Sequence, residues 1–181
     1  MKTILVIPNE GIGSIKLGMS PAQVLDAINE ELADLPDISN NDMQISETNE
    51  GAGVTVRYMK GPYFFMVHYM NGISAEISVN RDLRESARVV LYDIDIFLTK
   101  AEQIVNRLKQ KSRLVCDWED EQLAYDYDFT DIGIRFWRDG VFHEKLLLDR
   151  EYMEMMKDVI EEEYRYLYFD IITVKKNYIK K

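Results

Sequence analysis

The sequence predicts an α+β fold in which two loop–helix–β-meander repeats share a mostly antiparallel sheet, followed by a C-terminal helix and strand. Two amphipathic helix patterns each follow a short apolar segment, and a run of short strand patterns follows each helix. The two openings also match in spacing and residue type: Ile15-x-Leu17-x-x-Ser20-x-Ala22 and Ile94-x-Ile96-x-x-Thr99-x-Ala101. We therefore expect one domain over residues 1–181, with pseudo-repeats at about 9–80 and 88–140 and a helix–strand unit at 149–175.

Composition limits the classes of partner. Of the 181 residues, 46% are apolar and 11% aromatic, which is enough for a hydrophobic core in a single medium domain. The net charge of −10 argues against nucleic acid or an anionic membrane as partner.

The single cysteine, Cys116, excludes an intramolecular disulfide. The apolar start ends at Pro8, too early for a signal peptide, and no apolar run approaches the roughly 20 residues that span a bilayer. We expect a cytoplasmic protein.

The first repeat opens with a well-specified helix start. Residues 3–7 suit a short strand, and a glycine-containing loop follows them. Ser20 and Gln23 have the spacing of a capping box, and Pro21 occupies the first helical position, where no N–H is needed. These signals predict a helix over residues 21–32, with Val24 and Ile28 on its apolar face.

A long loop is expected at residues 33–53, where Asp, Asn, Ser, Pro and Gly gather. Strands are then expected at 54–59, 63–70 and 73–79. The dipeptide Asn71-Gly72 predicts a type I′ turn between the last two. The middle strand is apolar on both faces, which predicts a central strand that is covered on both sides.

The second repeat follows the same order. A strand is expected at 88–92, and Thr99 with Glu102 suggests a second capping box before a helix with an apolar stripe. Three further strands are expected at 113–118, 123–127 and 132–137. After them come an amphipathic helix over 149–163, a strand over 166–174 and a basic, solvated tail at 175–181.

The search for catalytic or metal-binding patterns finds none that is complete. The spacing of Asp117, Glu119 and Glu121 fails as an EF-hand, because Gln122 stands where glycine is needed and Asp128 where the bidentate Glu belongs. Gly11-x-Gly13 lacks the remainder of a phosphate loop, and Ser20 lacks a nucleophile elbow. We therefore expect no metal, no cofactor and no enzymatic activity. The remaining enzyme hypothesis would need Arg135, Arg138 and His143 to converge.

The most unusual segment is residues 117–131, in which seven of fifteen residues are acidic, none is basic and four are aromatic. One interpretation is a hairpin with its aromatic face in the core and its acidic face in water. The other is an acidic surface that binds a basic partner through charge steering and aromatic anchors. The candidate partner-binding residues are Asp117, Trp118, Glu119, Asp120, Glu121, Asp126, Asp128 and Asp131.

The opening Gly11-Ile-Gly-Ser-Ile-Lys-Leu-Gly-Met-Ser resembles the opening of a group of bacterial proteins that are candidate immunity proteins of polymorphic-toxin and contact-dependent inhibition systems. The segments 92–102, 132–138 and 168–174 fit the same resemblance. Leu-Gly-Met-Ser before a helix is also similar to β-lactamase-inhibitor-protein-like domains and to the outer-membrane assembly lipoprotein, which bind proteins and catalyse nothing.

The resemblance implies a protein that binds and neutralises the C-terminal domain of a cognate toxin, expected to be a basic nuclease. Because fold and family do not fix function, it leaves an alternative open. That alternative is a small-molecule or peptide-binding module that uses an apolar cleft between the two repeats.

Overall fold

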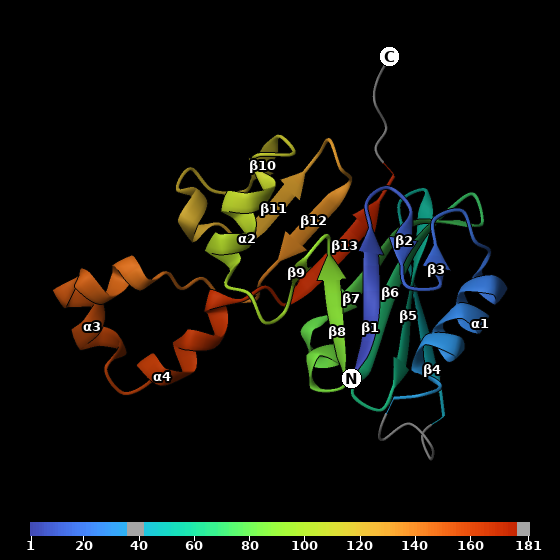
Figure 1. Ribbon diagram of the computed structural model, residues 1–181, viewed down its shortest axis with the longest axis horizontal. Helices are drawn as coiled ribbons and strands as arrows, with labels where there is room; N and C mark the ends of the chain where they lie inside the picture. The colour runs from blue at the N-terminus through green and yellow to red at the C-terminus, as the bar shows by residue number, and fades with distance from the viewer. Residues whose placement is uncertain (36–41, 177–181) are drawn as a thin grey trace.

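The computed structural model describes residues 1–35 and 42–176 and has the predicted α+β fold, built around two sheets (Figure 1). In spatial order, the five-stranded sheet contains β3 (Ile15–Lys16), β2 (Gly11–Ile12), β1 (Lys2–Ile7), β8 (Ala87–Leu91) and β9 (Ile94–Asp95). The eight-stranded sheet contains β10 (Leu114–Cys116), β11 (Asp126–Phe129), β12 (Ile134–Trp137), β13 (Ile171–Lys175), β7 (Ile73–Asn80), β6 (Tyr63–Met70), β5 (Gly53–Lys60) and β4 (Gln44–Glu50).

Both repeats contribute strands to both sheets. The larger sheet is antiparallel throughout and holds both meanders, which confirms the predicted shared sheet. Its two halves are joined by β13, which pairs with β12 on one side and β7 on the other. The smaller sheet was not predicted. Its centre is a parallel pair in which β1, which precedes the first repeat, lies beside β8, at the start of the second.

Helix α1 (Pro21–Leu32) has the bounds and the capping box that the sequence predicts. The Ser20 hydroxyl accepts from the Gln23 backbone N–H, and the Gln23 side chain accepts from the Ser20 N–H. Both bonds satisfy donors that the first turn of a helix leaves free. The apolar face of α1 is buried, with Val24 and Ile28 fully enclosed.

Helix α2 (Ala101–Leu108) buries its predicted apolar stripe, but the second capping box is absent. The cap position is Lys100, one residue later than expected, and no side chain caps it. The Glu102 carboxylate instead lies 3.3 Å from His143 and accepts from Gln122 at 3.4 Å. Tertiary partners therefore hold the side chain that a capping box would need.

The core lies on one face of the eight-stranded sheet, between that sheet, the five-stranded sheet and helices α1 and α2. Gly18 and Ser74 tie the two sheets together, because the Gly18 N–H donates to the Ser74 carbonyl and the Ser74 N–H donates to the Met19 carbonyl, both at 2.8 Å. Strand β6 is central in its sheet, as predicted. Its other face is only half-buried, so the expectation that both faces are covered is wrong. We call this side, which carries Phe64, Met66, His68 and Met70, the open face.

The segment expected to be a long loop contains strand β4, so that prediction is wrong for residues 44–50. All seven side chains of β4 are exposed, and it lies at the sheet edge with β5 as its partner. A strand that buries nothing has no hydrophobic alternation to reveal it. Residues 36–41 of the expected loop lie outside the described residues. The Asn71-Gly72 turn is confirmed by positive φ values of 53° and 79°.

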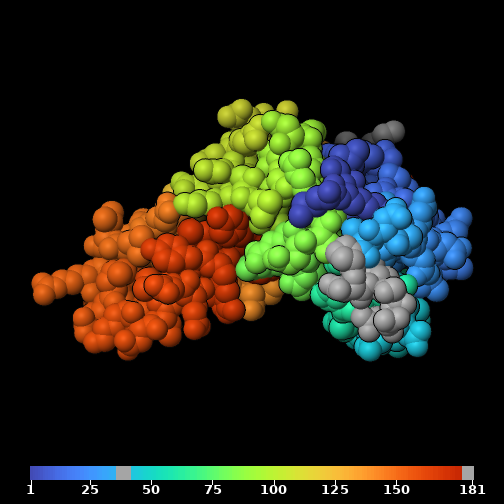
Figure 2. Space-filling model, turned by 60° about the horizontal axis from the view of Figure 1, so that its bottom comes forward, coloured from blue at the N-terminus to red at the C-terminus, as the bar shows by residue number. Residues whose placement is uncertain are grey.

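The expected single helix at 149–163 is broken into α3 (Arg150–Met156) and α4 (Ile160–Glu163). Between η3 (Glu144–Leu148) and η4 (Tyr164–Leu167), they form a projection, residues 144–167, that we call the arm (Figures 1 and 2). The ring centroid of Phe142 lies 6.4 Å from that of Tyr152 and 5.4 Å from that of Tyr164. A straight helix would separate two such tyrosines by about 18 Å, so the chain must fold back.

The final strand is shorter than expected, because η4 occupies part of the segment 166–174. Residues 177–181 of the basic tail lie outside the described residues. None of the helices in the described ranges is long and apolar enough to cross a membrane.

Candidate functional site

The acidic segment is divided between several places in the structure. Residues 117–123, which we call the acidic loop, form most of the connection between β10 and β11 and include the short 3₁₀ helix η2 (Glu121–Leu123). This helix delays the start of β11 to Asp126, three residues later than expected. Asp117 closes the loop, because its Oδ1 accepts from the backbone N–H groups of Tyr125 and Asp126, both at 3.0 Å.

Three of the predicted partner-binding residues lie away from this loop. Asp126 and Asp128 lie on the open face, where they pair with Arg135 and, at 2.5 Å, with Lys175. Asp131 lies after β11 and accepts from the Arg113 N–H at 2.7 Å. Tyr127 and Phe129 point into the core, as the hairpin interpretation predicts, but Tyr125, which that interpretation placed on the same face, is 45% exposed. The structure thus groups Asp117, Trp118, Glu119, Asp120 and Glu121, and separates the other three from them.

The acidic loop presents both an aromatic ring and carboxylates to solvent. The Trp118 residue is 60% exposed, and Glu119 beside it is exposed as well. Asp120 and Glu121 are held by lysines, with Lys145 Nζ 2.5 Å from Asp120 Oδ2 and Lys109 Nζ 2.8 Å from Glu121. A large exposed aromatic side chain within a charged rim is typical of protein-binding surfaces.

The arm presents a second exposed surface of mixed character. Neither α3 nor α4 contains a buried residue. Leu148 is 88% exposed and Met155 is 72% exposed, although both are apolar. Helices of four to seven residues are unstable alone in water and depend on tertiary packing. Here the Phe142 ring packs against Tyr152 and Tyr164 at the base of the arm. The sequence analysis did not predict that these side chains are exposed, because an apolar stripe on a helix normally indicates a buried face.

Ion pairs attach the base of the arm to the acidic loop and to α2. Besides the Lys145–Asp120 pair, Lys100 Nζ lies 2.6 Å from Glu144 Oε1. The hydrogen bond from Lys145 lowers the pKa of Asp120, and the hydrogen bond from Lys100 lowers the pKa of Glu144. We call the acidic loop and the arm together the acidic end.

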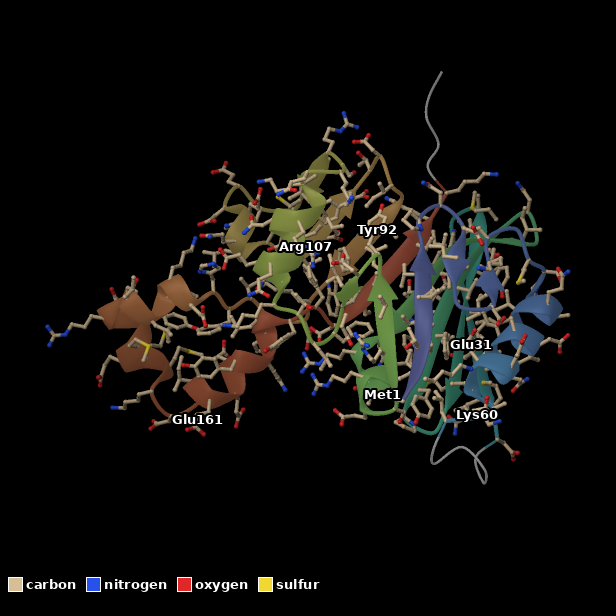
Figure 3. The ribbon with its side chains drawn as sticks, viewed as in Figure 1. Met1, Glu31, Lys60, Tyr92, Arg107 and Glu161 are labelled. Atoms are coloured by element: carbon tan, nitrogen blue, oxygen red, sulfur yellow. The ribbon has the colours of Figure 1, made fainter. Side chains whose placement is uncertain are left out.

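The acidic end holds most of the net charge of the protein. Residues 117–123 carry four acidic and no basic side chains, and residues 144–167 carry eight acidic and four basic ones. The two segments therefore account for −8 of the total formal charge of −10. Figure 3 shows side chains around Glu161 projecting from the arm into solvent, at the opposite end of the molecule from Glu31 on α1.

A buried arginine supports the acidic loop from below. Arg138 is 2% exposed, and its five N–H groups point at neutral oxygens. These acceptors are the carbonyls of Ala124, Phe142, Tyr166 and Gln122 and the hydroxyl of Tyr127. Burial lowers the pKa of Arg138, and burial raises the pKa of Tyr127 to about 12. With every donor occupied, Arg138 has no N–H left for a ligand, so its role is to hold the backbone of the loop.

The three residues of the enzyme hypothesis do not converge. Arg138 and His143 line one cavity between α2 and the acidic loop, whereas Arg135 pairs with Asp126 on the open face. The cavity has a volume of about 50 Å³, which holds a few waters but is far below the usual size of a ligand site. Its lining mixes acidic residues such as Glu102 with apolar ones such as Phe142 and Leu167, so it is smaller and less uniformly apolar than the cleft of the small-molecule alternative.

Within the described residues, no group of three His, Cys, Asp or Glu side chains is placed to hold a metal ion. Comparison with protein-family models, with curated proteins and with solved structures returned no match to this chain.

Proposed function

We propose that this chain is an immunity protein that binds and neutralises a basic toxin domain through its acidic end. The observation that carries the proposal is the concentration of −8 of the formal charge on one end of the molecule, together with exposed apolar side chains there. The resemblance of the opening motif to candidate immunity proteins selects this role among protein-binding functions. We place the contacts on Trp118 and Glu119 of the acidic loop and on the exposed face of the arm.

Charge and apolar area have separate roles in this proposal. A single-sign acidic end accelerates encounter with a basic surface and fixes the orientation of the partner. Trp118, Leu148 and Met155 then supply apolar area that becomes buried in the complex. The exposed helices of the arm gain the packing that they lack in the free chain.

The test is co-expression with the toxin C-terminal domain encoded immediately upstream, followed by growth assays and calorimetry at low and high salt. The test variant carries Glu119→Lys, Glu151→Lys and Glu161→Lys, all at exposed positions of the acidic end. The control variant carries Asp26→Lys, Glu30→Lys and Asp34→Lys, which make the same charge change at the opposite end of the molecule.

We expect the test variant to weaken binding about tenfold or more, to reduce its salt dependence and to lose protection in the growth assay. The control should bind within about twofold of the wild type, because its charges lie beyond the screening length from the contact. Equal loss in both variants would mean that net charge alone matters, and the acidic end would then be the wrong site. Absence of binding to a folded upstream domain would contradict the immunity role.

A further inference from the structure

A groove of about 540 Å³ lies on the open face beside the return of the arm. Its floor is a row of residues across neighbouring strands: Trp137 on β12 is opposite Ile171 on β13, which is opposite Asn80 on β7. Phe64 of β6 and Tyr166 of η4 add two more aromatic rings to the lining. The volume falls in the range of sites that bind small ligands or single side chains. We call this site the aromatic groove.

The positive groups of the groove are already engaged. Arg81 donates to Asp170 at 2.8 Å and to the carbonyl of Arg165 at 3.1 Å. The Arg165 guanidinium lies 4.5 Å from the centroid of the Tyr166 ring and donates to its hydroxyl. Asp170 is also engaged, because its second oxygen accepts from the Asp139 N–H at 2.7 Å. A ligand would therefore meet few free donors in the groove.

The free polar groups of the groove are acceptors. Neither Asp82 nor Asp139 forms an ion pair with any described residue. Asn80 donates from Nδ2 to Asp82 at 2.6 Å, which fixes the orientation of its amide. The Asn80 Oδ1 is buried and has no hydrogen-bond partner, so its partial negative charge beneath the groove is not neutralised. These three groups give the groove a negative potential next to exposed aromatic rings.

A cationic, flat, donor-rich group complements this lining. A guanidinium supplies five N–H donors, a positive charge and a planar face that stacks on aromatic rings. An anionic ligand is disfavoured, because three carboxylates and two arginines give the lining a net formal charge of −1, and one of these arginines is paired with Asp170. Arg165 already stacks on the Tyr166 ring, so the rings that remain for an incoming guanidinium are those of Trp137 and Phe64.

We infer that the aromatic groove binds the side chain of an arginine presented by a protein partner. The inference rests on the proposed function, because the same basic partner would supply the arginine. Arg165 and Tyr166 belong to the arm, so a partner seated on the acidic end reaches the groove along η4. In this arrangement the acidic end steers the partner, and the groove selects for one arginine at a defined position.

The test uses the full chain and a probe that is independent of the partner: N-acetyl-arginine methylamide, compared with its neutral citrulline analogue. The chain has two tryptophans, so its indole N–H signals in a ¹H–¹⁵N NMR spectrum report separately on the groove, through Trp137, and on the acidic loop, through Trp118. We expect the arginine probe to shift the Trp137 signal saturably and to leave Trp118 unchanged. The citrulline probe should shift neither signal.

Asp82→Asn combined with Asp139→Asn should weaken binding of the arginine probe about two- to fivefold, the scale of an exposed charge interaction. The matched control, Asp26→Asn with Asp34→Asn, should leave the affinity for the arginine probe unchanged. The NMR spectra also show whether each variant is folded. An equal response to citrulline, a response at Trp118 only or no response at Trp137 would each overturn the inference. Toxin binding without a Trp137 response would leave the proposed function standing, whereas a Trp137 response without toxin binding would leave only the groove.

Discussion

Nη2 of Arg138 donates to the hydroxyl of Tyr127 across 2.8 Å, and that hydroxyl donates in turn to the Glu121 carbonyl at 2.6 Å. This chain of bonds runs from the residue after β12 through β11 to the acidic loop. It places a buried cation beneath the most acidic loop of the molecule, with its N–H groups directed at neutral oxygens. The loop is therefore held in place by buried contacts, while Trp118 and Glu119 on its outer side are exposed to solvent.

Replacing Arg138 with methionine should destabilise the fold by about 3 kcal/mol, because several buried carbonyls lose their donor. Arg135→Met is the matched control. Its guanidinium is about half exposed and pairs with Asp126, so its loss should cost less than about 1 kcal/mol. Urea unfolding followed by circular dichroism measures both free energies. Equal costs for the two variants would contradict the supporting role assigned to Arg138.

The two expected capping boxes can be compared directly. Ser20→Ala should lower the free energy of unfolding by about 1 kcal/mol, because the hydroxyl caps α1. Thr99→Ala should change it by less than about 0.5 kcal/mol, because no side chain caps α2. Thermal or urea unfolding of the two variants tests the difference. A loss of equal size at Thr99 would mean that α2 is capped in solution.

Acid should loosen the arm before the sheets. The pKa values of Asp120 and Glu144 are lowered in the fold by Lys145 and Lys100. A lowered carboxyl pKa contributes stability that is fully present above the unfolded-state values of 3.8 and 4.5, and that is lost as pH falls through the folded values. Arm amides in ¹H–¹⁵N spectra should therefore move toward disordered positions below about pH 4, ahead of those in β5–β7.

The control for this pH effect is Lys100→Gln combined with Lys145→Gln. It removes both cations, so the arm should already be loosened at neutral pH and should respond less to acid. If the arm and the sheets lost structure together in the wild type, the two ion pairs would not be what attaches the arm.

Hydrogen exchange should separate the arm from the core. Amides of α3 and α4 should exchange much faster than those of β6, because these helices bury no residue whereas alternate residues of β6 are fully buried. The measurement is mass spectrometry of exchanged peptides. If a toxin domain binds the acidic end, its addition should slow exchange of the arm amides. Slow exchange in the free arm would show that it is stably packed without a partner.

Local signals in the sequence were sufficient for much of the fold. The bounds of α1 follow from Ser20, Pro21 and Gln23, which act within one helical turn. Strands β6 and β7 follow from their short runs of apolar, aromatic and β-branched residues and from the Asn71-Gly72 turn that joins them. The repetition of the two openings also predicted a shared sheet, because each meander needs a partner to bury its apolar face.

The candidate site was predicted only in part, for a physical reason. The acidic segment was visible as composition, but its division depended on where the chain turns. The 3₁₀ helix at Glu121–Leu123 shifts the start of β11, and the pairing of β11 with β12 places Asp126 opposite Trp137 on the open face. Composition gives the number of charges, whereas only tertiary pairing decides which of them share a surface.

The sequence by itself determined the elements whose stabilising contacts lie within a few residues: the cap of α1, the hairpins and the apolar faces. The tertiary structure alone decided the parallel pairing of β1 with β8, the exposed strand β4, the broken helix of the arm and the buried arginine. Each of these depends on groups that are distant along the chain, such as Phe142 with Tyr164 or Arg138 with Tyr127. Such contacts leave no periodic pattern in the sequence, because their geometry exists only once the sheets have assembled.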